Sequence, residues 1–215
     1  MIIIGAKGFA KEVLEVLHQL NQTNHVAFYD DVNEIGDTLY DTFPILKNED
    51  QVRDFFKANG PTFTIGIGAP KYRYIMCKKF ESLGGKLVST ISPFSHLGHY
   101  GNQIEKGGNI MTGTVITSDV TIGKGCLINL NCTVGHDTII EEFVELCPGV
   151  HISGNCKIGK FTFIGTNATI LPNVTIGQNV VIGAGALVNK DVPDNVLVIG
   201  SPAKVIKELP EIDYL

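Results

Sequence analysis

One aliphatic residue in every six marks the second half of this chain. The spacing holds without a break over 15 positions, and chance cannot produce it, because only about a quarter of residues in ordinary proteins are aliphatic. A mostly small residue comes two positions earlier in each unit, and glycine often follows the aliphatic residue, as in Ile122-Gly123. The repeated positions are Ile104, Ile110, Ile116, Ile122, Ile128, Val134, Ile140, Leu146, Ile152, Ile158, Ile164, Ile170, Ile176, Ile182 and Val188.

A six-residue unit predicts a short strand that buries one aliphatic side chain, followed by a corner. Glycine suits such corners because it tolerates unusual backbone angles. Three corners close a triangular coil of about 18 residues, so the repeat predicts about four to five stacked coils. The aliphatic residues then form one continuous core, and strand edges are paired except at the ends. We therefore expect a parallel β-helix over residues 96–192, followed by a tail over 193–215 with a short helix near 203–209.

The first 95 residues predict a different architecture, a small α/β domain. Apolar strands are expected at 2–4, 26–29, 63–68 and 86–91, and helices at 9–20 and 71–83. Strands that alternate with helices favour a parallel, Rossmann-like sheet.

Composition and charge exclude several functions. The net charge of −5, from 17 Lys+Arg against 22 Asp+Glu, argues against a nucleic-acid partner. No apolar run reaches the ~18 residues of a membrane span, and the N-terminus lacks a signal peptide, so we expect a cytoplasmic protein without a membrane partner. The five cysteines show no paired spacing. Buried packing is the expected role for them, and we predict no metal site.

His136 is the main catalytic candidate from the residues themselves. It lies two positions after the inward Val134, at a corner of the coil, and Asp137 follows it. A histidine with a pKa near neutrality suits proton removal, and an adjacent acid can orient it. Gly154 comes one coil later and is expected to leave a gap beside the imidazole. A solvated surface histidine is the alternative.

The repeat, the opening Gly5-Ala6-Lys7-Gly8-Phe9 and the closing Gly200-Ser201-Pro202-Ala203-Lys204 resemble the hexapeptide-repeat sugar acetyltransferases. The most similar members are the bacillosamine-type nucleotide-amino-sugar N-acetyltransferases and the sialic acid O-acetyltransferases. This resemblance implies a left-handed β-helix, a homotrimer with active sites between subunits, and acetyl-CoA as co-substrate. It implies acetylation of the amino group of a UDP- or dTDP-linked amino sugar in bacterial surface glycan biosynthesis, with O-acetylation of a sugar hydroxyl as the alternative.

The resemblance also assigns roles along the coil. His136 matches the family's general base, and Asp137 stands where the bacillosamine-type enzyme has a glutamate. Gly154 is expected to leave room for the thioester of the cofactor, and the line of Thr166 and Ala184, which are 18 residues apart, is expected to offer backbone groups to the pantetheine arm. Two further residues are expected to bind the cofactor: Glu145, where the family often has a histidine, and Lys204, beside the phosphates of CoA.

The N-terminal domain is expected to bind the nucleotide. A glycine loop that opens a helix can hold a phosphate on its backbone N–H groups. Asp30 and Asp31 end the second strand and suit a uridine or ribose hydroxyl, and Gly68 ends the third strand at the same edge. The loop residues expected to bind substrate are Gly5, Lys7, Gly8 and Phe9, of which Lys7 and Phe9 differ from the serine and histidine of the bacillosamine-type enzyme.

Two other classes fit less well. A zinc hydratase of carbonic anhydrase type needs several converging histidines, and the repeat contains only His136 and His151. A non-catalytic β-helix binding scaffold, such as an ice-binding protein, needs a regular outward ladder of threonine, which the sequence lacks.

Overall fold

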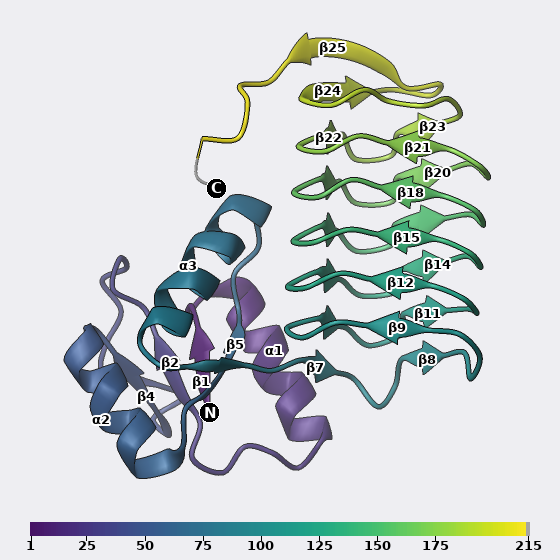
Figure 1. Ribbon diagram of the computed structural model, residues 1–215. Helices are drawn as coiled ribbons and strands as arrows, with labels where there is room; N and C mark the ends of the chain where they lie inside the picture. Colours follow the sequence, from purple (N-terminus) through teal and green to yellow (C-terminus); the bar gives the residue numbers. More distant parts are fainter. Residues whose placement is uncertain (214–215) are drawn as a thin grey trace.

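The computed structural model describes residues 1–213 and shows an α/β domain beside a tall stack of coils (Figure 1). The α/β domain has one six-stranded sheet in the order β3-β4-β2-β1-β5-β6, parallel except for the β3–β4 hairpin. Its strands are β1 (Ile2–Ile4), β2 (Ala27–Tyr29), β3 (Thr38–Leu39), β4 (Phe43–Leu46), β5 (Thr62–Ile65) and β6 (Lys86–Leu87). Its helices are α1 (Gly8–Gln19), α2 (Glu49–Asn59) and α3 (Pro70–Ser82).

The parallel sheet expected for the first domain is confirmed, but the sequence reading missed α2 and the β3–β4 hairpin. Helix α2 buries only Val52 and Phe56, so its apolar pattern is weak. Its start does carry a signal, since the Asn48 side chain accepts a hydrogen bond from the backbone N–H of Gln51.

The coils distribute their strands over three faces. The first face contains β7 (Thr90–Ile91), β10 (Asn109–Ile110), β13 (Leu127–Ile128), β16 (Glu145–Leu146), β19 (Phe163–Ile164), β22 (Val181–Ile182), β24 (Val196–Ile199) and β25 (Lys204–Glu208). The second face contains β8 (His96–Leu97), β11 (Val115–Ile116), β14 (Thr133–Val134), β17 (His151–Ile152), β20 (Thr169–Ile170) and β23 (Leu187–Val188). The third face contains β9 (Gln103–Ile104), β12 (Thr121–Ile122), β15 (Ile139–Ile140), β18 (Lys157–Ile158) and β21 (Thr175–Ile176).

The predicted inward positions form the core of the coil. Every aliphatic residue of the six-residue repeat is buried except Ile104, which is partly buried against the same core. Each of the strands β9 to β20 pairs in parallel with the strand 18 residues later, as in Ile122 with Ile140. The triangular coil expected from the repeat is therefore confirmed.

The glycines that follow the inward residues have a different role from the one expected. They do not provide unusual backbone angles. A side chain at Gly159 or Gly165 would lie 2.5–2.6 Å from the backbone of the next coil, so close stacking of the coils requires glycine there. The left-handed backbone angles occur two residues further on, at glycine or at asparagine and aspartate such as Asn155 and Asp137.

Both ends of the coil extend beyond the regular repeat. The division expected after residue 95 falls inside the first coil, because β7 already pairs with β10. The spacing of Ile91, Leu97 and Ile104 departs from six at the last step, so the repeat in the sequence begins late. The helix expected near 203–209 is wrong, since Lys204–Glu208 forms strand β25 antiparallel to β24.

The α/β domain covers the lower coils of the first face (Figure 1). Tyr74 of α3 packs edge-on against Phe143 and Phe161 at the corner between the third and first faces, with ring centroids 5.3 and 5.5 Å away. Val16 of α1 packs with Met111 and Leu127. The corner between the second and third faces is consequently the part of the coil opposite the α/β domain.

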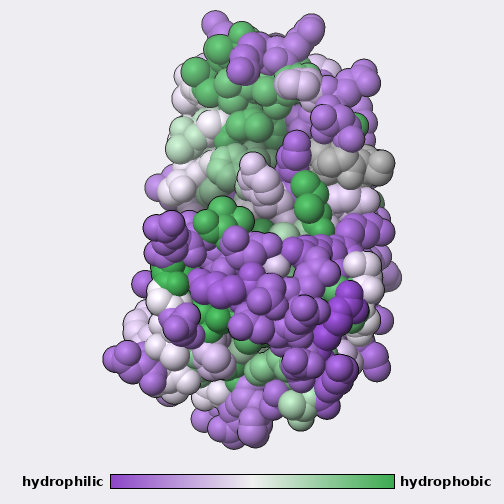
Figure 2. Space-filling model, turned by 90° about the vertical axis from the view of Figure 1, so that its left-hand side faces the viewer, coloured by the Kyte–Doolittle hydropathy of each residue, from purple (hydrophilic) through white to green (hydrophobic). Residues whose placement is uncertain are grey.

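Above the α/β domain, the same side of the molecule is apolar. Figure 2 shows hydrophobic surface gathered over its upper coils. The last two strands of the first face expose Ile199, Val205 and Ile206. Within residues 1–213, no helix combines the length and the apolar character needed to cross a bilayer.

Candidate active site

His136 lies in the turn between β14 and β15, at the corner opposite the α/β domain. Its Nδ1 is 2.6 Å from Oδ2 of Asp137, and both side chains are more than half exposed. An ionised carboxylate can only accept a hydrogen bond, so Nδ1 carries the proton and Nε2 keeps a lone pair that can accept one. The pair therefore has the arrangement of an oriented general base.

The backbone explains why an aspartate follows this histidine. Asp137 has φ of +58°, at the corner position that is occupied elsewhere in the coil mostly by glycine, asparagine or aspartate, with Phe143 and Phe161 as exceptions. Aspartate adopts this conformation more readily than most residues. Asp137 therefore both turns the chain and orients the imidazole.

Gly154 lies directly against the imidazole of His136. A side-chain carbon at Gly154 would lie 2.6 Å from Nε2 of His136. The coils are in register at this point, because the backbone N–H of Asn155 donates a hydrogen bond to the carbonyl oxygen of His136 over 2.8 Å. The imidazole therefore packs on Gly154, and a larger residue at this position would displace the ring.

Thr166 and Ala184 lie on a different corner, between the first and second faces. Both are exposed, and the backbone N–H of Gly185 donates to the carbonyl oxygen of Thr166 over 2.8 Å, so they form one line along the coil. The whole second face separates this line from His136 within one chain. Lys204 is exposed at the start of β25.

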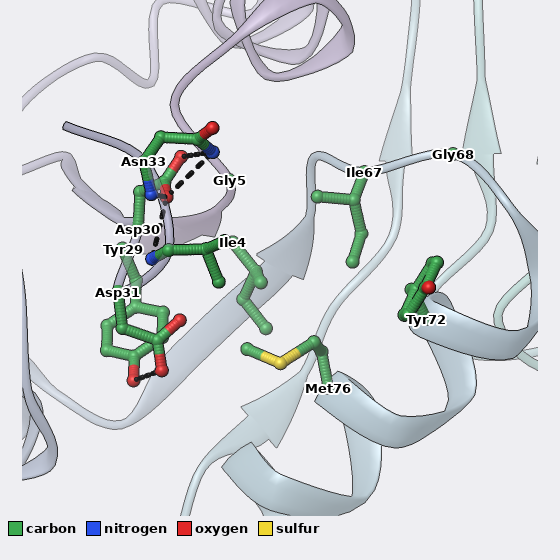
Figure 3. A pocket seen from close by; sticks show the side chains of 11 residues that line it. Ile4, Gly5, Tyr29, Asp30, Asp31, Asn33, Ile67, Gly68, Tyr72 and Met76 are labelled. Atoms are coloured by element: carbon green, nitrogen blue, oxygen red, sulfur yellow. Dashed lines mark hydrogen bonds between the residues drawn. The ribbon is translucent and has the colours of Figure 1, made fainter. Parts of the chain in front are cut away.

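The residues expected to bind substrate surround two adjoining hollows at the carboxyl ends of β1, β2 and β5. The larger, of about 370 Å³, is lined by Gly5, Asp30, Asp31 and Gly68 (Figure 3). The smaller, of about 200 Å³, shares three of these residues and adds Lys7, Gly8 and Phe9. The structure therefore brings together all seven residues that the sequence indicated.

The two aspartates of this pocket have different surroundings. Asp30 is buried, and its carboxylate accepts hydrogen bonds from the backbone N–H groups of Val32 and Asn33 and from the Asn33 amide, so it closes a turn. Asp31 accepts hydrogen bonds from the Tyr29 hydroxyl (2.7 Å) and from Lys79 Nζ (3.0 Å). Partial burial opposes ionisation of Asp31, but these two bonds outweigh it and hold the pKa of the carboxyl below its ordinary value.

The sequence reading missed the apolar walls of the pocket. Tyr29 at the end of β2 and Ile67 in the loop after β5 line the pocket on one side. Tyr72 and Met76 of α3 also line it. Figure 3 shows the side chains of Ile67 and Met76 on the pocket wall. Tyr72 and Met76 are four residues apart on a helix and so share one face, which is the signal that would have indicated them.

Glu145 lies beneath the loop that follows β5. The backbone N–H of Ala69 donates a hydrogen bond to its Oε2 over 2.6 Å. Burial raises the pKa of the Glu145 carboxyl above its usual value, opposed by this hydrogen bond and by the charge of Arg73. Within one chain, Glu145 on the first face and His136 at the opposite corner lie on different sides of the coil.

His136 and the pocket of the α/β domain are also on different sides of the coil. The pocket opens in the α/β domain, which covers the first face, whereas His136 is at the corner between the second and third faces. Among the described residues, no group of three or more histidine, cysteine, aspartate or glutamate side chains is placed to hold a metal ion.

Two families match parts of this chain. Residues 1–80 match the PglD N-terminal domain, and residues 155–190 match the bacterial transferase hexapeptide repeats. Among curated proteins, none matches the chain significantly.

Solved structures match nearly the whole chain. The acetyltransferase domain of PglB from Neisseria gonorrhoeae, in complex with acetyl coenzyme A, is 30% identical over 95% of this chain and 98% of that chain, with a TM-score of 0.86. PerB from Caulobacter crescentus, in complex with CoA and GDP-perosamine, is 29% identical over 96% of both chains, with a TM-score of 0.88. WeeI from Acinetobacter baumannii AYE is 29% identical over 95% of this chain and 98% of that chain, with a TM-score of 0.85.

These likenesses cover both parts of the fold. They extend over the PglD-type α/β domain and over the repeat, whose coils form a left-handed parallel β-helix. The chain therefore belongs to the hexapeptide-repeat sugar N-acetyltransferases.

Proposed function

We propose that this protein transfers an acetyl group from acetyl-CoA to the amino group of a nucleotide-linked amino sugar, for bacterial surface glycan synthesis. The observation that carries the proposal is the oriented His136, whose Nδ1 is held by Asp137 and whose Nε2 lies against Gly154. The N-terminal pocket supplies a place for the nucleotide. The similar PerB structure contains CoA and GDP-perosamine, which supports both substrate classes.

The chemistry follows from the two nitrogens of His136. Nδ1 is held by Asp137, and Nε2 takes a proton from the sugar amine as its nitrogen bonds to the acetyl carbonyl carbon. The carbon–sulfur bond of the thioester then breaks, the CoA sulfur leaves with the bonding electrons, and it takes the proton from Nε2 of the imidazolium, which restores the neutral base. A base placed in this way typically contributes about 10²–10⁴-fold to the rate.

The cofactor-binding residues are part of the same proposal. Gly154 lies next to the base, where the thioester is proposed to bind, and the exposed line of Thr166 and Ala184 offers backbone groups to the pantetheine arm. Lys204 can place a positive charge near the CoA phosphates. Glu145 is not included in this set, because its carboxylate accepts the hydrogen bond from the backbone N–H of Ala69 on the first face.

We propose that the active unit is a homotrimer with each site between two chains. The argument is geometric: within one chain the nucleotide pocket and His136 are on opposite sides of the coil, so a second copy must supply one of them. The apolar surface at Ile199, Val205 and Ile206 supports such a contact, because exposed apolar patches mark protein interfaces. Light scattering tests the assembly, and a stable, fully active monomer would contradict it.

We also propose a cytoplasmic location, because of the cysteines. The five cysteines are free in the structure, including the buried Cys126 and Cys132. Free thiols persist in a reducing compartment.

The activity test uses the purified protein, acetyl-CoA and a panel of UDP-, dTDP- and GDP-linked amino sugars, with the hydroxyl-bearing analogues as matched controls. Mass spectrometry should detect the addition of one acetyl group to the amino sugar and none to its control. Acetylation of the hydroxyl analogue would instead support O-transfer. If no compound is acetylated and CoA does not raise the thermal midpoint, the proposal is wrong.

A further inference from the structure

Glu145 and Arg73 form a buried connection between the nucleotide pocket and the coil. We propose that these two residues are positioning residues, which hold the loop over residues 66–69 and so fix the direction in which the bound nucleotide presents its sugar. This inference rests on the proposed function, because it concerns the same pocket.

Glu145 acts on the loop directly. Its Oε2 accepts the hydrogen bond from the Ala69 N–H, and a side-chain carbon at Gly68 would lie 3.0 Å from its other oxygen, Oε1. Ala69 has φ of +56°, which is uncommon for alanine, so this loop conformation needs an external support. The carboxylate of Glu145 supplies that support from the opposite domain.

The same carboxylate lies at the N-terminus of α3. Ala69 is the N-cap residue of this helix and makes no side-chain capping bond, and the first turn contains no acidic residue. A negative charge near a helix N-terminus is stabilising because of the helix dipole. Glu145 therefore stabilises the start of α3, a role that the side chain of the N-cap residue has in many other helices.

Arg73 holds the loop from its other side. The guanidinium is fully buried and donates to the carbonyl oxygens of Ile65 and Ile67 in the α/β domain. It also donates to Gly125 and Cys126 and to the Asn109 side chain in the coil. Burial lowers the pKa of Arg73 to about 10, with the charge of Glu145 acting in the opposite direction, so Arg73 remains charged at neutral pH.

The loop and helix held in this way are walls of the nucleotide pocket. Ile67 and Gly68 belong to the loop, and Tyr72 and Met76 to the helix that it starts (Figure 3). A change at Glu145 should therefore alter nucleotide binding before it alters the binding of acetyl-CoA. A purely structural residue would lower stability without this selectivity.

The experiment measures ligand binding and kinetics of two variants. Glu145→Leu removes both the acceptor and the charge, and Glu145→Gln keeps an acceptor for Ala69. UDP, dTDP and GDP are each titrated alone by calorimetry, and KM is measured for the nucleotide sugar and for acetyl-CoA. We expect Glu145→Leu to weaken nucleotide binding about tenfold, since a hydrogen bond to a charged group is lost, and Glu145→Gln to recover part of this loss. KM for acetyl-CoA should not change.

Two controls separate positioning from stability. Glu142→Leu changes an exposed acid of the same coil, and Thr162→Val removes a buried hydrogen bond to Gly177 within the coil. Neither should affect nucleotide binding, even where Thr162→Val lowers the thermal midpoint. In addition, Arg73→Lys should weaken nucleotide binding, and its effect should not add to that of Glu145→Leu, because both act on one loop.

Several results would overturn the inference. Unchanged nucleotide affinity in folded Glu145→Leu would do so, as would a rise in the KM for acetyl-CoA alone, which would assign Glu145 to the cofactor. If Glu145→Leu does not fold, Glu145→Gln decides, and nucleotide affinity equal to the wild type would overturn the inference. A wild-type protein that binds none of the nucleotides would instead contradict the proposed function itself.

Discussion

The two ring nitrogens of His136 have different surroundings, and each can be tested separately. Nδ1 meets Asp137, and Nε2 faces Gly154. We expect His136→Ala to lower turnover by about 10²–10⁴-fold, since the amine proton loses its acceptor. Binding of CoA, measured by calorimetry, should survive. Asp137→Asn should have a smaller effect, because asparagine fits the same backbone angle and still accepts from Nδ1. Near-normal turnover of His136→Ala would place the base elsewhere.

Gly154→Ala tests the contact between Gly154 and Nε2 of His136. The added methyl carbon would lie 2.6 Å from that nitrogen, so the imidazole must turn away. A small displacement of a catalytic group is costly, and we expect turnover to fall by about tenfold or more. Gly36→Ala is the matched control, because a methyl group there meets nothing within 4 Å. Full turnover of Gly154→Ala would show that Nε2 does not act on the substrate.

At the level of residues, a contact could be predicted from the sequence only where the six-residue repeat determines which residues stack on each other. The proximity of His136 and Gly154 could be predicted, because stacked coils bring residues 18 apart together. The contact of Glu145 with Ala69 could not, since it joins two domains whose relative placement no periodicity encodes. The pocket walls at Tyr72 and Met76 are an intermediate case, because their spacing of four residues places them on one face of a helix but does not show what that face contacts.

At the level of the elements, the coil depends on its buried aliphatic column. Ile158 in β18 is fully buried, and Ile158→Asp would place an unpaired charge in that column. We expect this variant not to fold, as judged by circular dichroism and soluble yield, because burial of an isolated charge is very unfavourable. Ile139→Asp is the matched control on the same face, where Ile139 is 45% exposed. A soluble, folded Ile158→Asp would contradict the inward placement.

Some elements could not be predicted from sequence patterns. The coil was predictable because one buried residue recurs in each strand. Helix α2 buries few residues, and the segment Lys204–Glu208 is exposed throughout. Strand β25 forms because β24 offers a free edge, which is a property of the assembled coil and not of the segment itself.

At the level of the whole molecule, the separation of the nucleotide pocket from His136 makes a mixing experiment decisive. His136→Ala has an intact pocket but no base. Ile67→Trp fills the pocket but keeps the base. If each site takes its base from one chain and its pocket from a neighbour, some sites in a mixed assembly contain both intact parts.

The two variants are unfolded together in equal amounts, refolded, and assayed beside each variant alone. Random association in a closed ring would restore about a quarter of wild-type activity, because each site needs the intact base and the intact pocket from two different chains. Each variant refolded alone should remain inactive. If the base and the pocket of one site belonged to the same chain, every chain in the mixture would carry one defect and no activity would return. The recovered activity therefore distinguishes a shared site from a site within one chain, independently of the assembly size.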